Sequence, residues 1–235
     1  AEAVTLTRET FQTLVVLSVI PGVLGVVVLA LVAREIAVAP RAAGVRLTLG
    51  ALDSRFKRFL LVMAVFTLGN SSDAFLILRA QERGLNVAGV LAMLMTFNII
   101  YAVFAGPLGA LSDRVGRRRL MIGGWLVYGL IYVGFALVAT GWQVWLLFAL
   151  YGLYYAAVEG TAKAYVADLV PSAQRGTAYG FFNATVGLMA LPASLLAGVL
   201  WQGVGAWAGF GPAAPFVVGA GLALLAAGLL VWWQR

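Results

Sequence analysis

The sequence predicts an all-α membrane protein with about seven transmembrane helices. Of its 235 residues, 63% are hydrophobic and only 11% are charged, and the mean hydropathy is +0.97. A soluble domain of this length cannot bury so much apolar surface, so a lipid bilayer must cover it. The charges also cluster between long uncharged stretches, as they do in chains that cross a membrane repeatedly.

The composition excludes several classes of function. The chain has no cysteine and no histidine, which removes disulfides, thiol catalysis and the commonest metal ligands. Carboxylates are then the side chains left to carry protons near neutral pH. We therefore expect no metal, no cofactor and no enzymatic activity.

The uncharged stretches define the crossings, because a spanning helix needs about 20 apolar residues. Two stretches are too long for one crossing and are divided, the first at Thr140–Gln143 and the second at Gly203–Pro212. The seven predicted spans are 10–33, 59–78 with a polar break at Asn70–Asp73, 84–112, 120–139, 144 to about 168, 176–202 and 213–234.

Basic residues in the connections give the orientation. Twelve of the 16 basic residues fall on one side, three on the other (Arg8, Arg79 and Arg83), and Lys163 lies within a span. Since basic loops remain in the cytoplasm, the net charge of +7 reports topology and does not predict a nucleic-acid partner. The cytoplasmic set is Arg34, Arg41, Arg46, Arg55, Lys57, Arg58, Arg114, Arg117, Arg118, Arg119, Arg175 and Arg235.

A motif stands between the third and fourth spans: Gly109-Ala-Leu-Ser-Asp113-Arg114-Val-Gly116-Arg117-Arg118-Arg119. It resembles the loop signature of the major facilitator superfamily, G-x-x-x-D-R-x-G-R-R-[RK], at every specified position. We expect Gly109 to permit close helix packing and Gly116 to permit a tight turn. We expect Asp113 to accept from an arginine or a helix N-terminus, with residues 113–119 forming a cytoplasmic loop. The alternative interpretation is a simple basic turn.

A second element, from Asp168 to Arg175, resembles the acid-x6-arginine element of the same superfamily. The resemblance implies that Asp168 pairs with Arg117 or Arg175 and latches a cytoplasmic gate. The alternative is a surface ion pair worth under about 1 kcal/mol.

The resemblance also implies a domain organisation. Superfamily members have twelve helices in two six-helix halves. Two spans lead into the motif, one further span precedes them, and four spans follow it. This order fits helices six to twelve. We therefore assign 1–33 to an external segment and helix six, 34–58 to the central cytoplasmic loop, and 59–235 to the C-terminal half. On this interpretation the chain is a fragment that lacks its N-terminal half.

Two groups of polar residues lie within the predicted spans, where an ionisable side chain needs a partner or a function. Asp73, after Asn70, is the first candidate for a protonatable residue, unless its polar neighbours merely satisfy it. Tyr151, Tyr155, Glu159 and Lys163 recur at intervals of four and share one helix face. That face either lines a substrate cavity or holds a self-neutralising Glu159–Lys163 pair.

These observations favour a permease of a bacterial inner membrane that moves a small molecule by alternating access. Proton coupling is the expected energy source, and the overall texture of the sequence resembles that of bacterial drug-efflux members, which include antiporters. A membrane enzyme is disfavoured by the absence of histidine and cysteine. A transport-inactive scaffold or sensor with the same fold remains the alternative.

Overall fold

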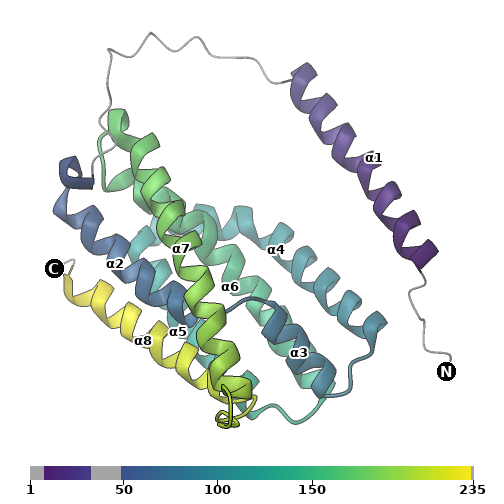
Figure 1. Cartoon of the computed structure of the whole chain (residues 1–235). Coiled ribbons are helices and arrows are strands. Elements are labelled where there is room, and N and C mark those ends of the chain that lie inside the picture. Colours follow the sequence, from purple (N-terminus) through teal and green to yellow (C-terminus); the bar gives the residue numbers. More distant parts are fainter. Residues whose placement is uncertain (1–7, 33–48, 234–235) are drawn as a thin grey trace. The chain divides into compact units, whose positions relative to one another are not determined.

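The computed structural model describes residues 8–32 and 49–233, and these are overwhelmingly helical (Figure 1). The chain divides into two compact units, 1–46 and 47–235, which are described separately. The N-terminal segment 1–7, most of the predicted central loop with Arg34, Arg41 and Arg46, and Arg235 lie outside the described residues. Within the described ranges, seven helical segments are long and apolar enough to cross a membrane, as expected.

The first unit contains one described helix, α1 (Arg8–Val32). It matches the predicted span 10–33 to within two residues. Its stretch Val15–Val32 has a mean hydropathy of 2.9, and none of that stretch is buried. Within this unit α1 therefore has an apolar surface all round, which suits a helix surrounded by lipid or by other helices.

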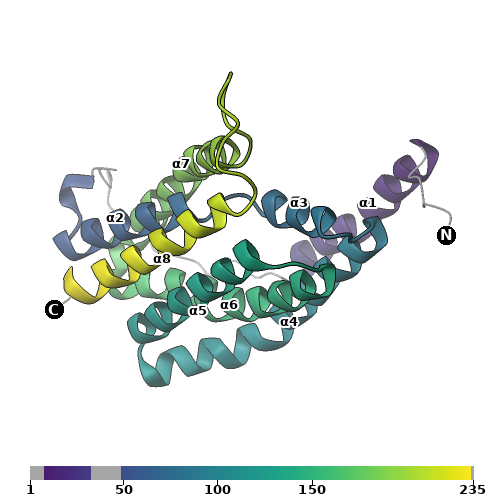
Figure 2. The ribbon, with the colours of Figure 1, turned by 90° about the horizontal axis from the view of Figure 1, so that it is seen from below.

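The second unit is a bundle in which neighbours in space are mostly not neighbours in sequence (Figures 1 and 2). The helix α6 packs between α4 and α5, α8 packs between α5 and α2, and α7 packs mainly against α2. The long helices are α2 (Ser54–Gly69), α4 (Val87–Val115), α5 (Arg117–Leu137), α6 (Gly141–Asp168), α7 (Arg175–Gln202) and α8 (Ala214–Trp233), with the short α3 (Ala74–Glu82) between α2 and α4.

The second predicted span is divided into α2 and α3, as its polar residues indicated. The helix ends at Gly69 and restarts at Ala74, leaving Asn70–Asp73 outside regular helix. At the other end α2 begins at Ser54, five residues before the predicted start at 59, because the side chain of Asp53 caps it by accepting from Arg55 N at 2.6 Å. Hydropathy placed the start of this helix too late, because its first residues are mostly polar or charged.

The end of α2 is fixed by close contacts with α8 and α5. A methyl group added to Gly219 of α8 would lie 2.5 Å from the carbonyl oxygen of Gly69, so only glycine permits this approach. The hydroxyl of Tyr128 on α5 donates to the same Gly69 carbonyl at 3.2 Å. This bond satisfies a carbonyl that the helix interruption leaves without an intrahelical partner.

The helix α3 is fixed by a buried arginine. Arg79, only 2% exposed, donates from Nε to the carbonyl oxygen of Phe135 and from Nη2 to that of Ala136, both at 3.0 Å. Its third nitrogen, Nη1, pairs with Glu82 at 2.7 Å. The guanidinium thereby caps the C-terminal end of α5, where unsatisfied carbonyls favour a cation.

The connection between α4 and α5 is shorter than predicted. We expected a loop over 113–119, but α4 continues to Val115 and α5 begins at Arg117, so Gly116 alone lies between them. Its φ of +94° is a conformation that favours glycine, which confirms the predicted tight turn. The loop prediction was wrong because charged residues were taken to end the helices, whereas Asp113 and Arg117–Arg119 occupy terminal helical turns.

Candidate functional site

A cavity of about 280 Å³ opens between α2, α6 and α7. Four aromatic rings, two amide side chains, one threonine and one ion pair contribute to its wall, and the other lining residues are apolar. The residues that line it are Met63, Phe66, Thr67, Asn70, Tyr154, Tyr155, Val158, Glu159, Ala162, Lys163, Phe182, Asn183 and Val186.

The predicted polar face of α6 runs from the core of the bundle to this cavity. Tyr151 is fully buried, Tyr155 and Glu159 are half-buried, and Lys163 is exposed. Tyr155, Glu159 and Lys163 line the cavity, whereas Tyr151 lies behind its wall. Three of the four residues on this face can therefore contact a molecule that enters the cavity.

Glu159 is held by partners on two helices. Lys163 Nζ lies 2.9 Å from Glu159 Oε1, which is the predicted intrahelical pair. The other carboxylate oxygen, Oε2, accepts from the hydroxyl of Tyr101 on α4 at 2.8 Å. Tyr101 is absent from the sequence-based candidates, because no periodicity within one helix indicates which residue of another helix will face it.

Asp73 lies at the N-terminus of α3 but does not cap it, since its side chain makes no capping hydrogen bond. Its carboxylate instead accepts from the hydroxyl of Tyr151 at 3.2 Å. The alternative in which Asp73 is satisfied by Asn70 and the adjacent serines is thus not what the structure shows. The two predicted groups of polar residues meet through this contact.

Asn70 lies beside the same tyrosines. Its Oδ1 is 3.4 Å from the hydroxyls of Tyr128 and Tyr132 and 3.5 Å from that of Tyr151, all at the long end of hydrogen bonding. The rings of Tyr128 and Tyr132 are stacked with centroids 4.0 Å apart. One amide oxygen of the helix interruption is therefore the common neighbour of three buried phenols.

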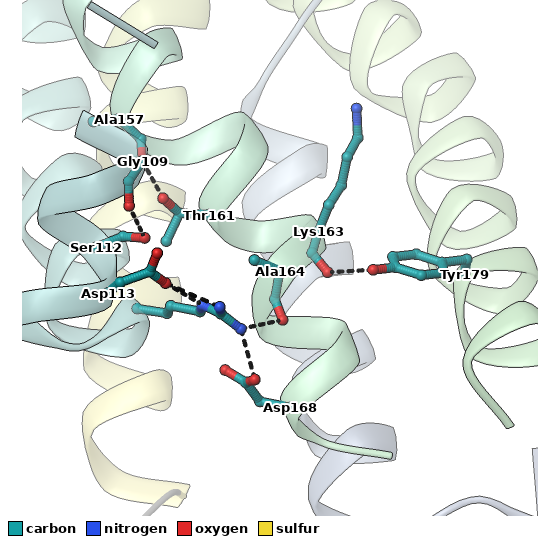
Figure 3. A network of polar contacts seen from close by, with 10 residues as sticks. Gly109, Ser112, Asp113, Ala157, Thr161, Lys163, Ala164, Asp168 and Tyr179 are labelled. Carbon is teal, nitrogen blue, oxygen red and sulfur yellow. Dashed lines mark hydrogen bonds and ion pairs between the residues drawn. The ribbon is translucent and has the colours of Figure 1, made fainter. Parts of the chain in front are cut away.

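The motif residues form a separate cluster at the end of the bundle (Figure 3). Arg117 at the start of α5 pairs with Asp113 of α4 at 2.9 Å and with Asp168 of α6 at 2.6 Å. It also donates to the carbonyl oxygen of Ala164 at 3.0 Å. One guanidinium thus joins the ends of three helices.

The other members of the predicted gate set have different positions. Arg118 donates to the carbonyl oxygens of Leu230 and Val231 at the end of α8, at 3.1 and 2.8 Å. Arg175 is the first residue of α7, and the described ion pair of Asp168 is with Arg117. Gly109 makes no close helix contact within the described residues, because no atom of another described helix lies within 4 Å of a methyl group placed there.

The chemistry available at these sites is hydrogen bonding, ion pairing and proton exchange on carboxylates. No group of three or more histidine, cysteine, aspartate or glutamate residues suited to hold a metal ion occurs among the residues that the structure describes. The fold and its cavity place the chain among polytopic α-helical membrane proteins.

Comparison with known proteins specifies the family. The family model of the Major Facilitator Superfamily matches residues 47–235. The chain therefore belongs to the major facilitator superfamily, as its motif suggested. The matched range coincides with the second unit, 47–235.

Three relatives illustrate the likeness. An uncharacterized MFS-type transporter of Methanocaldococcus jannaschii is 41% identical over 77% of this chain and 45% of its own length. The class B tetracycline resistance protein of Escherichia coli is 30% identical over 66% of this chain and 36% of its own length. A Na⁺, Li⁺, K⁺/H⁺ antiporter of Planococcus maritimus is 27% identical over 52% of this chain and 30% of its own length. The chain spans less than half the length of these relatives.

Proposed function

We propose that this chain is part of a secondary transporter that moves a small molecule across the membrane by alternating access. The observation that carries the proposal is the cavity between α2, α6 and α7, with the carboxylate of Glu159 in its wall. Amide, phenol and carboxylate groups beside aromatic rings suit a small organic molecule that stacks and that both donates and accepts hydrogen bonds. Relatives named for tetracycline resistance and for cation/proton antiport support a transporter in preference to an enzyme.

Proton-coupled efflux is the proposed mode of energy coupling. Asp73 sits where the helix is interrupted, and its only described side-chain partner is the hydroxyl of Tyr151. Glu159, by contrast, is balanced by Lys163. A carboxylate without a cationic partner within a span is the better proton carrier, because its charge is costly there and protonation relieves that cost. Asp73 therefore ranks first and Glu159 second.

The cluster around Arg117 is proposed to latch one state of a gate. Gly109, Asp113, Arg114, Gly116, Arg117, Arg118, Asp168 and Arg175 form the proposed gate region on the cytoplasmic side. Because Arg117 joins the ends of α4, α5 and α6, a rearrangement of any one of these ends changes its contacts. Such contacts can bias a two-state equilibrium by a few kcal/mol at most.

We further propose that the second unit is the C-terminal six-helix half of the transporter, with α1 as helix six. Exposed small residues on α4 and α7 support a missing helical partner, since such faces let helices approach closely. Gly106 of α4 and Gly180 and Gly187 of α7 have no described atom within 4 Å of an added methyl group. The proposed location is the inner membrane of a bacterial cell, with the basic ends of the helices in the cytoplasm.

The decisive experiment reconstitutes the complete transporter in liposomes under an imposed pH gradient. Asp73→Asn should abolish gradient-driven flux while leaving passive exchange of substrate measurable, because the amide imitates a permanently protonated carboxyl. Glu159→Gln is the matched variant, and loss of coupling only there would move the proton site to α6. The absence of any flux from the unmodified protein would favour the alternative of a transport-inactive scaffold or sensor.

The 235-residue chain alone supplies the complementary test. On the half-transporter interpretation it inserts into membranes but shows no coupled transport, because its cavity face lacks the other half. Saturable uptake by the purified chain, abolished by Asp73→Asn, would show that the chain transports without another half. That result would contradict the half-transporter interpretation.

A further inference from the structure

A second cavity, of about 590 Å³, lies at the end of the bundle around the turn at Gly116. It is separate from the proposed substrate cavity and shares no lining residue with it. Its wall combines four arginines and two aspartates with apolar side chains. The lining residues are Asp113, Arg114, Val115, Gly116, Arg117, Arg118, Arg119, Ile122, Tyr165 and Asp168.

The charges of this cavity are unequally satisfied. Arg117 is paired with both aspartates, and Arg118 donates to the carbonyl oxygens at the end of α8. Arg114 and Arg119 are exposed, and neither forms a salt bridge within the described part of the chain. Two guanidinium groups on either side of Gly116 are therefore available to an anion, in a cavity with a net positive charge.

Arg119 also stands at the end of an apolar face of α5. The exposed residues Leu126, Leu130 and Leu137 follow it at helical spacing, and their exposed fractions are 45%, 73% and 78%. Side chains at this spacing form a continuous stripe along one side of a helix. A molecule held by Arg119 therefore has an open hydrophobic surface running from it toward the other end of the bundle.

Arg114 has a similar setting on α4. Leu111, three residues before Arg114 and 39% exposed, is its neighbour on the helix surface. Large apolar side chains suit contact with acyl chains, while small residues suit close contact with another helix. Leu111 therefore offers an acyl chain an apolar contact beside Arg114.

We propose that Arg114 and Arg119 bind the phosphate of an anionic phospholipid, whose acyl chains lie along the exposed leucine face of α5. Guanidinium groups match phosphate oxygens in geometry and charge, and basic pockets at the cytoplasmic ends of transmembrane helices favour anionic headgroups. The apolar side chains of Val115 and Ile122 in the wall suit the glycerol region of a lipid better than a free hydrated anion. The inference is independent of the proposed transport activity.

The test measures binding of defined lipids to the purified chain in detergent by native mass spectrometry. The probes are phosphatidylglycerol, phosphatidylcholine with the same acyl chains, and inorganic phosphate. We expect phosphatidylglycerol to bind preferentially. Arg114→Gln and Arg119→Gln should each weaken it about fivefold, and the double variant about thirtyfold, since each surface cation contributes about 1 kcal/mol. Arg175→Gln, at the same end of the bundle but outside the cavity, should leave binding unchanged.

Three results would overturn the proposal. Equal binding of phosphatidylcholine would show that the anionic charge is not recognised. An equal loss on Arg175→Gln would show a diffuse basic surface in place of a site. Displacement of the lipid by inorganic phosphate at comparable concentration would assign the two arginines to a free anion. The comparison of headgroups uses the unmodified chain, so the proposal stays testable even if a variant fails to fold.

Discussion

The hydroxyl of Tyr101 donates a 2.8 Å hydrogen bond to Glu159, which ties the middle of α4 to the polar face of α6. Lys163 binds the other oxygen of the same carboxylate. Glu159 is thus held by a neutral donor from one helix and a cation from its own. Its position in the cavity wall depends on a residue that lies 58 positions away in the sequence.

We predict that Tyr101→Phe lowers the free energy of unfolding by about 1 kcal/mol, the usual contribution of one hydrogen bond. The substitution removes the bond to Glu159 and keeps the ring. In the complete transporter it should also reduce the transport rate, because Glu159 loses one of its two anchors. Tyr154→Phe is the control, since the hydroxyl of Tyr154, a residue of the cavity wall, donates no described hydrogen bond. Equal effects of the two substitutions would contradict this role of Tyr101.

A second prediction concerns the cluster at the end of the bundle. Arg117→Ala should slow transport in the complete protein several-fold at matched expression, because it separates Asp113 and Asp168 from their common partner. Its effect on stability should be small, since partly exposed ion pairs contribute about 1 kcal/mol or less. Arg55→Ala, in the first turn of α2 and outside the proposed gate region, should leave the initial rate of uptake unchanged. Normal turnover of the Arg117→Ala protein would contradict the proposed latch.

Arg79 should matter more for stability than any exposed arginine. Arg79→Gln should lower the free energy of unfolding by about 3 kcal/mol, because buried hydrogen bonds to a charged group are among the stronger ones. The loss is measured by tryptophan fluorescence during denaturation in detergent. Gln81→Ala, an exposed change on the same helix, should have almost no effect. A small loss at Arg79 would show that α3 is held by its apolar contacts alone.

The topology is open to direct measurement because the chain has no cysteine. Ser172→Cys, beside the start of α7, should react with an impermeant thiol reagent only after the cells are permeabilised. Ala208→Cys, in the connection between α7 and α8, should react in intact cells, since both positions are exposed. The reverse pattern would invert the predicted orientation.

The sequence predicted most of the helices because each span must be apolar enough to cross the bilayer. Hydropathy and charge show this for each span separately. It also predicted the turn at Gly116 and the break at Asn70–Asp73, where the local residue types oppose a continuous helix. The resemblance of two motifs implied that Asp168 pairs with Arg117 or Arg175, and in the structure it pairs with Arg117. The length of the connection at 113–119 was overestimated, because charged residues can occupy terminal turns of a helix.

The contacts that shape the candidate site could not be predicted in the same way. The bonds from Tyr101 to Glu159, from Tyr151 to Asp73 and from Arg79 to the end of α5 each join different helices. Such contacts depend on how each helix is rotated about its axis and on its depth in the bundle. Neither quantity follows from the periodicity of a single helix.

The break between α2 and α3 has a mechanical consequence. Tyr128 of α5 holds the last carbonyl before the break, and Arg79 fastens the helix after it to the end of the same α5. Both α2 and α3 are therefore attached to α5. The angle between α2 and α3 cannot change much unless one of these two attachments breaks. The bend is thus attached to α5 on both sides, and we expect Asp73, which lies on it, to move together with α5.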